Sequence, residues 1–256
     1  MSEPTKLIIT KADLDENNVY VGSADVTDWH GDIEIAADLG WVRFSASLRA
    51  SRSIVSLAGS GIKAGWGIEA GSGIKAGSGI KAGWGIEAGL GIEAGEGIEA
   101  GWGIKAGWGI KAGWGIEAGW GIKAGWGIEA GSGIEAGEGI EAGWGIKAGE
   151  GIDAGWGIKA GWGIKAGEGI EAGEGIEAGS GIKAGWGIEA GLGIEAGLSI
   201  VAAWIASKLR IFAGTCIWRL PSPEEQQVRA ELREGVIAFG EHVPPQRAEA
   251  AKVESV

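Results

Sequence analysis

Residues 101–130 read GWGIKAGWGIKAGWGIEAGWGIKAGWGIEA, which is five copies of one six-residue unit. The unit runs without insertion or deletion from Gly59 to Ala196, in 23 successive copies. Both Gly, the Ile and the Ala never vary; the second position (x) is Trp, Ser, Glu or Leu, and the fifth is Lys, Glu or Asp. Such regularity predicts one small structural unit stacked many times.

The variable positions show which side chains face water. The fifth position is Lys ten times, Glu twelve times and Asp once, and an unpaired charge of either sign is costly to bury. Ile, a charged residue and Ala alternate with a period of two, as in a strand that turns Ile and Ala inward. We expect Gly-x-Gly to form a corner, because Gly accepts positive φ and allows close approach of neighbouring coils. The x side chain then points outward.

We therefore predict an all-β fold: a single-stranded parallel β-solenoid of hexapeptide repeats. Two Gly in every six residues would each cost a helix about 1 kcal/mol relative to Ala. Collagen requires Gly at every third position, which this repeat lacks. A disordered Gly-rich tract is the remaining alternative, and the regular Ile positions and apolar flanks argue against it.

Two coil lengths compete, a three-sided 18-residue coil of three hexads and a two-sided 12-residue coil of two. With three hexads per coil, two Trp columns form: Trp66, Trp84, Trp102 and Trp120 in one, and Trp108, Trp126, Trp144 and Trp162 in the other. Opposite charges favour the shorter coil, since 13 of 21 neighbours are opposite in sign with two hexads and 9 of 20 with three. We favour the 18-residue coil, because stacked Trp pairs outweigh exposed ion pairs, each worth under about 1 kcal/mol.

The chain divides into four predicted regions. Residues 1–58 form an N-terminal β cap with strands at 6–10, 19–21, 32–36 and 41–48, and residues 59–196 form the solenoid. Residues 197–243 form degenerate coils closed by a β-hairpin, with strands at 227–232 and 236–239 around Gly235. Val201, Phe212 and Trp218 make outward positions apolar there, so we expect this hairpin to cover them. Residues 244–256 form a mobile tail.

The repeat resembles two groups of proteins. The spacing of one branched aliphatic residue in every six is distantly similar to that in hexapeptide-repeat β-helices. Those proteins, however, carry a small residue four positions after the aliphatic one, where this chain has x. The G-x-G-I-[KE]-A array followed by the segment LRIFAG at 209–214 looks more like Gly-rich bacterial hexapeptide-repeat β-solenoid proteins of unassigned function. This second resemblance implies a fold and no activity.

Charge and composition limit the partners and the location. A net charge of −12 argues against direct contact with nucleic acid or anionic membrane, because phosphate binding needs Lys and Arg. The first residues show no signal-peptide pattern and no apolar run reaches membrane length, so we expect a cytoplasmic protein. Cys216 is the only Cys and cannot form an internal disulfide.

No enzyme is visible in the sequence. His30 and His242 lie in opposite flanks, and Cys216, which has no His near it in sequence, is expected to be a core thiol. Repeated columns of Lys and Glu offer no single asymmetric pocket of the kind that catalysis requires. We expect no catalytic residue, no metal site and no cofactor.

The leading hypothesis is a structural scaffold, a rigid rod that presents Trp ladders and charge columns for self-association or partner binding. One alternative is a carbohydrate-binding module that uses the Trp ladder. Another is an acidic solenoid that mimics DNA, with an acidic column of Glu99, Glu117, Glu135, Asp153, Glu171 and Glu189. We expect a homo-oligomer formed through the Trp columns or a solenoid end. The predicted interaction surface is formed by Trp66, Trp84, Trp102, Trp108, Trp114, Trp120, Trp126, Trp144, Trp156, Trp162 and Trp186.

Overall fold

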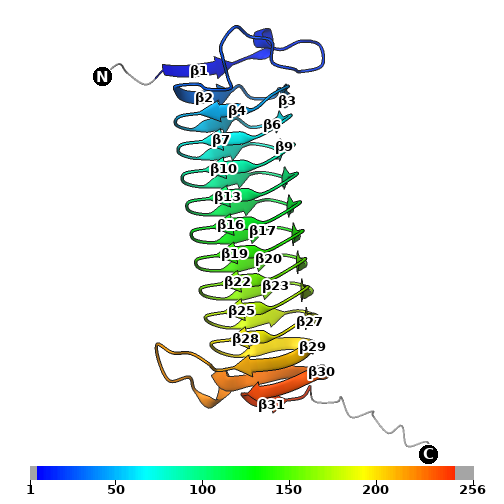
Figure 1. The fold of residues 1–256 in the computed structure, drawn as a ribbon. Coiled ribbons are helices and arrows are strands. Elements are labelled where there is room, and N and C mark those ends of the chain that lie inside the picture. The colour runs from blue at the N-terminus through cyan, green and yellow to red at the C-terminus, as the bar shows by residue number, and fades with distance from the viewer. Residues whose placement is uncertain (1–4, 246–256) are drawn as a thin grey trace, which may run out of the picture.

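The computed structural model describes residues 5–245, which wind into a three-sided β-solenoid (Figure 1). Each hexad contributes one short strand of Ile, a charged residue and Ala. Each strand of the array from Ser60–Ala64 to Ile182–Ala184 pairs in parallel with the strand three further along, as when Ile104 pairs with Ile122. The last two strands of the array pair with the long strand Ile200–Ala213. The predicted all-β class and the 18-residue coil are confirmed, and the 12-residue coil is excluded.

The strands form three faces, which we call A, B and C. Face A holds β4 (Leu48–Ala50), β7 (Ile68–Ala70), β10 (Ile86–Ala88), β13 (Ile104–Ala106), β16 (Ile122–Ala124), β19 (Ile140–Ala142), β22 (Ile158–Ala160), β25 (Ile176–Ala178) and β28 (Ile194–Ala196). Face B holds β5 (Ile54–Ser56), β8 (Ile74–Ala76), β11 (Ile92–Ala94), β14 (Ile110–Ala112), β17 (Ile128–Ala130), β20 (Ile146–Ala148), β23 (Ile164–Ala166) and β26 (Ile182–Ala184). Face C holds β6 (Ser60–Ala64), β9 (Ile80–Ala82), β12 (Ile98–Ala100), β15 (Ile116–Ala118), β18 (Ile134–Ala136), β21 (Ile152–Ala154), β24 (Ile170–Ala172) and β27 (Gly187–Ala190).

The core is built from the two invariant apolar positions. The repeat Ile side chains are 0–1% exposed and the repeat Ala side chains 0–4%, so both point into the prism as the alternation predicts. The charged residue between them faces outward on every strand. Because the interior repeats along the whole array, the core is continuous from end to end.

The corners depend on the close approach of backbones rather than on unusual φ angles. A Cβ on the first Gly of a hexad, from Gly83 to Gly197, would lie 1.8–2.2 Å from the carbonyl oxygen of the Gly one coil earlier. The second Gly is less crowded: from Gly85 to Gly175 the nearest backbone oxygen lies at 3.1–3.7 Å. Within the array only Gly59 has positive φ, so the expectation of left-handed glycines at the corners was wrong.

The N-terminal segment continues the stack of strands. Its elements are β1 (Thr5–Ile9), the 3-10 helix η1 (Lys11–Asp13), β2 (Gly31–Ile35) and β3 (Gly40–Phe44). β1 pairs with β2, β2 with β5 and β3 with β6, all in parallel. The strand predicted at 19–21 was wrong, because Val19 and Tyr20 make only isolated bridges, to Arg43 and Leu14. The loop that carries them bulges beyond β1 at the blue end of Figure 1.

The C-terminal segment does not form the predicted hairpin. β29 (Ile200–Ala213) pairs in turn with β26, β27 and β28, and β30 (Gln227–Phe239) lies parallel to β29. The 3-10 helix η2 (Pro223–Gln226) precedes β30, and β31 (Glu241–Val243) follows it. The hairpin was wrong because Gly235, with φ +98° and a Cβ position 2.4 Å from the Ser207 oxygen, lies within β30 and packs on the preceding coil.

The outward apolar residues of this region occupy two different structural environments. Val201 pairs with Lys183 and Phe212 with Glu195, so both occupy the charged register position, as predicted. Trp218 lies in the loop after β29, where no strand pairs with it. The tail predicted at 244–256 lies, from residue 246 onward, outside the described residues.

The two Gly of one hexad should differ sharply in their tolerance of Ala. A Cβ at position 131 would meet the Gly113 oxygen at 1.9 Å, whereas at position 133 the nearest oxygen, of Gly151, is 3.5 Å away. We expect Gly131→Ala to lower the free energy of unfolding by about 2 kcal/mol or more, and Gly133→Ala to change it by less than about 1 kcal/mol. Denaturant unfolding measures both. Equal losses would contradict the close-approach explanation.

Candidate interaction surface

Two Trp columns run along the corners that border face A. The first column, Trp66, Trp84, Trp102 and Trp120, lies between faces C and A, with ring centroids 5.2–5.5 Å apart and planes within 5–9°. The second, Trp108, Trp126, Trp144 and Trp162, lies between faces A and B, with centroids 5.8–6.3 Å apart and planes within 17–26°. All six predicted stacking steps are therefore present.

Stacking turns the indole faces toward one another and leaves their outer edges in solvent. The Trp side chains of the array remain 49–68% exposed, with Trp84 and Trp102 at the lower limit inside a column and Trp186 at the upper limit. Trp114 and Trp186 lie on the third corner, between faces B and C, and neither has a stacked neighbour among the described residues. Trp156 precedes β22 and so continues the first column beyond Glu138. Nine of the eleven predicted surface Trp residues thus border face A.

A further ring, which the repeat pattern does not predict, extends the second column. After Trp162 the next x residue is Ser180, and Trp218, from the loop after β29, stacks on Trp162 at 5.6 Å and 12°. The Arg219 guanidinium lies 5.2 Å from the Trp218 ring, within cation–π range. Arg219 also donates two hydrogen bonds, of 2.6 and 2.7 Å, to Glu225, and these lower the pKa of Glu225 to about 2. The loop therefore closes the end of this column.

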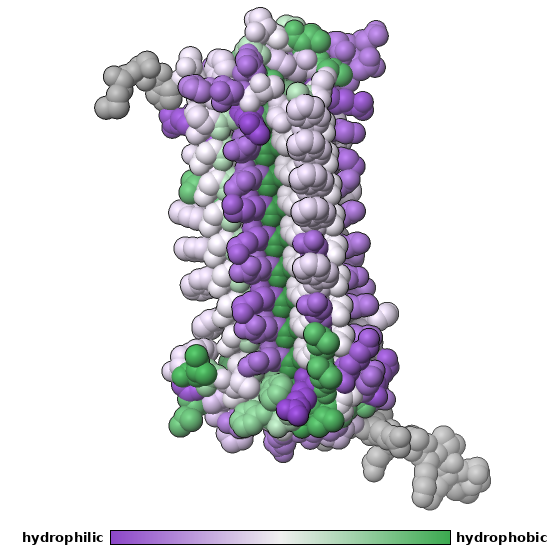
Figure 2. Space-filling view, in the orientation of Figure 1, coloured by the Kyte–Doolittle hydropathy of each residue, from purple (hydrophilic) through white to green (hydrophobic). Residues whose placement is uncertain are grey.

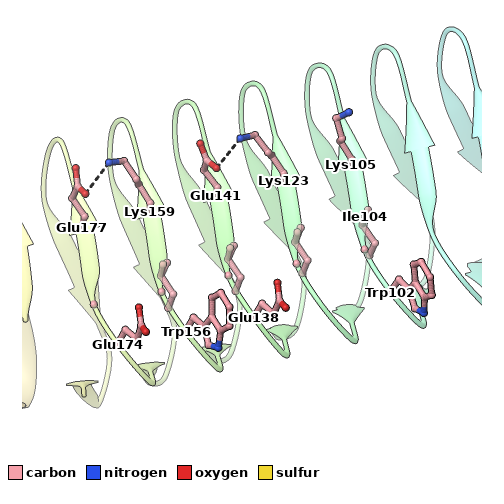
Figure 3. Close-up of a pocket in the computed structure, with 18 of the residues that line it drawn as sticks. Trp102, Ile104, Lys105, Lys123, Glu138, Glu141, Trp156, Lys159, Glu174 and Glu177 are labelled. Carbon is pink, nitrogen blue, oxygen red and sulfur yellow. Dashed lines mark hydrogen bonds and ion pairs between the residues drawn. The ribbon is translucent and has the colours of Figure 1, made fainter. Parts of the chain in front are cut away.

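Shallow grooves run between each x column and the charge column of the same face. On face A the groove floor is made of the Gly and Ile of successive hexads, visible as the green stripe in Figure 2. Its far wall consists of side chains of both charges, some of which pair between coils at 2.8 Å: Lys105 with Glu87, Lys123 with Glu141 and Lys159 with Glu177. Figure 3 shows the last two of these pairs. Face A is thus a long surface with an indole wall and a largely neutralised ionic wall.

Faces B and C carry unbalanced charge. Face C aligns the predicted acidic column in one register, from Glu99 to Glu189. Among the described residues only Glu99, which contacts Lys81, has an ion-pair partner in that column. The pKa of Glu171 is raised mainly by burial of its carboxylate and, to a smaller extent, by the negative charges of Asp153 and Glu189. Face B has the opposite bias, since Lys165 and Lys183 form no ion pair within the described part of the chain.

The residues considered for catalysis lie apart from one another. His30 lies in the N-terminal loop, and His242 lies in β31 with Nε2 2.9 Å from the Ala230 oxygen. Cys216 is only partly buried, in the loop after β29, so the expectation of a core thiol was wrong. In residues 5–245 no group of three or more His, Cys, Asp or Glu is placed to hold a metal ion. The helices of the same segment include none long and apolar enough to cross a membrane.

Comparison with known proteins adds no relative. No protein-family model, no curated protein and no solved structure matches the chain. The resemblance to Gly-rich hexapeptide-repeat proteins therefore stays a prediction, while the β-solenoid with three hexads per coil rests on the structure itself.

Replacing a Trp inside a column should destabilise the fold more than replacing an isolated one. Trp126 stacks on Trp108 and Trp144, and each aromatic pair contributes about 0.5–1.5 kcal/mol. We expect Trp126→Ser to lower the free energy of unfolding by about 1–3 kcal/mol and Trp114→Ser by less than about 1 kcal/mol. Denaturant unfolding gives both values. Ser is a fair replacement because it occupies this position in five copies. Equal effects would refute the stabilising role of stacking.

Reversing one charge should reveal the repulsion along face C. Glu171 lies between Asp153 and Glu189. Its pKa is raised in the folded chain, so the ionised carboxylate destabilises the fold at a pH above that pKa, and this destabilisation is lost as the pH falls through it. At pH 7 we expect Glu171→Lys to raise the free energy of unfolding by about 0.5–1 kcal/mol, less at high salt.

The matched control is Glu141→Lys on face A, where the neighbours on both sides are Lys123 and Lys159. This change should lower the free energy of unfolding by a similar amount. If both substitutions shift stability in the same direction, charge pairing between coils does not explain the effect.

Proposed function

We propose that the protein is a non-enzymatic scaffold, a rigid rod that binds a second copy of itself along face A. The observation that carries this proposal is that both Trp columns border the same face and stay exposed. The loop with Trp218 covers one end of the second column, where Trp218 stacks on Trp162.

The exposed indole area is large enough for a stable interface. A Trp side chain has roughly 250 Å² of surface, so nine half-exposed rings present on the order of 1,000 Å². A soluble monomer normally leaves apolar patches of only a few hundred Å². A stable dimer buries about 800 Å² on each partner, so this surface is of the required size.

A two-fold axis parallel to the rods suits the positions of the two columns. Such an axis turns face A of one copy onto face A of the other and places the first column opposite the partner's second column at the same level. Three coils carry Trp in both columns: Trp102 with Trp108, Trp120 with Trp126, and Trp156 with Trp162. Isologous pairing of this kind is the commonest form of association because one patch serves both partners.

The alternatives predicted from the sequence have less support. A sugar ring stacks on an exposed indole face, whereas most indole faces of the columns are occupied by the neighbouring indole. An acidic mimic of DNA would use face C, where the acidic column is continuous, and this remains a second candidate that would bind a basic protein.

Analytical ultracentrifugation at tens of micromolar tests the scaffold proposal. We expect the wild type to sediment as a dimer, and the triple variant Trp108→Ser, Trp126→Ser, Trp144→Ser as a folded monomer. The matched control is Trp114→Ser with Trp186→Ser, which removes exposed Trp from the third corner and should leave the dimer intact. A monomeric wild type, or equal dissociation of both variants, would rule out association through face A.

A further inference from the structure

The first Trp column is interrupted at two places, and the interruptions are acidic. In successive coils its x residues are Trp120, Glu138, Trp156 and Glu174. Figure 2 shows the two hydrophilic side chains within the column of indoles, and Figure 3 shows Glu138, Trp156 and Glu174 projecting in one row from neighbouring coils. The second column has no such break between Trp108 and Trp162.

Glu138 lies between the indoles of Trp120 and Trp156, with no other aromatic ring between them. Its N–H donates to the Trp120 oxygen at 2.7 Å, and the Trp156 N–H donates to the Glu138 oxygen at 2.9 Å, so the three residues occupy consecutive coils. Trp120 stacks on Trp102 with one face and turns the other toward Glu138. In residues 5–245 Trp156 has no stacked partner. Two strand spacings put the facing indoles about 10 Å apart.

The carboxylate in this notch has no basic neighbour to neutralise it. Within the described chain Glu138 forms no ion pair or side-chain hydrogen bond. The flanking bases on face A are engaged elsewhere, Lys123 with Glu141 and Lys159 with Glu177. A Glu side chain is also shorter than an indole, so the outer parts of both rings extend beyond the carboxylate and leave a space above it.

We propose that the notch formed by Trp120, Glu138 and Trp156 binds a quaternary ammonium group. A cation midway between the rings would lie about 5 Å from each, inside the range of about 6 Å over which indole faces attract cations. A flat guanidinium sandwiched between rings needs a narrower gap, and a neutral sugar gains nothing from the carboxylate. This binding activity goes beyond the scaffold function, and it would compete with dimer formation because Trp120 and Trp156 also belong to the proposed dimer surface.

The array supplies its own comparison sites. Of the five Glu at the x position, only Glu138 has Trp on both sides. Glu174 lies between Trp156 and Leu192, and Glu150 between Ser132 and Glu168. If a carboxylate alone attracted the cation, Glu150 would serve equally well; if two indole faces are required, only the Glu138 notch will bind.

The test uses the triple variant Trp108→Ser, Trp126→Ser, Trp144→Ser, in which face A is expected to be free, and follows the indole N–H signals by ¹⁵N NMR. Choline is the first probe, and its neutral isostere 3,3-dimethylbutan-1-ol is the control. We expect choline to shift the signals of Trp120 and Trp156 with a Kd of about 1–10 mM, and the alcohol to bind at least about tenfold more weakly. A peptide with one trimethyllysine, compared with its unmodified form, separates a protein-borne group from a free one.

Three substitutions in the same background complete the test. We expect Trp156→Ser to abolish the choline-dependent shift of Trp120, Glu138→Gln to weaken binding about fivefold, and Glu150→Gln to leave it unchanged. Circular dichroism checks that each variant folds. The proposal is overturned if the alcohol binds as well as choline, if no indole signal moves at about 50 mM choline, or if Glu138→Gln and Glu150→Gln behave alike. If the triple variant still dimerises, the scaffold proposal fails, but the choline titration still tests the notch.

Discussion

The close contact between the first Gly of one hexad and the Gly carbonyl one coil earlier is the constraint on which the rest of the structure depends. With no room for a Cβ at 1.8–2.2 Å from that oxygen, the corners stack as tightly as the strands do. Every outward side chain therefore repeats at the strand spacing of about 4.8 Å. That single spacing allows indoles to stack, allows Lys and Glu to pair between coils, and holds like charges together on face C.

The coil length was predictable because stacked Trp pairs contribute more free energy than exposed ion pairs do. Trp columns pointed to three hexads per coil and charge pairing to two, and the structure has three, with all six Trp steps stacked. The ion pairs that do form, such as Lys123 with Glu141, are exposed, so they contribute little and cannot decide the winding. Buried Ile and outward charge followed directly from the variability of each position.

Features outside the exact repeat were harder to predict, because they depend on contacts distant in sequence. Turn residues around Gly235 are typical of a hairpin, yet the preceding coil offers a parallel edge that the long strand β30 can follow without reversing. Trp218 belongs to no hexad, so its stacking on Trp162 leaves no periodic signal. The positive φ expected at the corners was wrong because spacing between backbones, rather than turn geometry, requires Gly there.

The division between fixed and variable positions explains how a uniform backbone carries distinct surfaces. Residues at x and at the fifth position do not contribute to the core, so Trp, Ser, Glu or Lys can occupy them without altering the winding. The same hexad therefore produces a neutralised face between two Trp columns, an acidic face and a basic one. It follows that a single exchange at x, such as Glu138 within a Trp column, changes local chemistry while the neighbouring coils keep their positions. Recognition in such a protein is specified by the order in which hexads with different residues at x and at the fifth position follow one another.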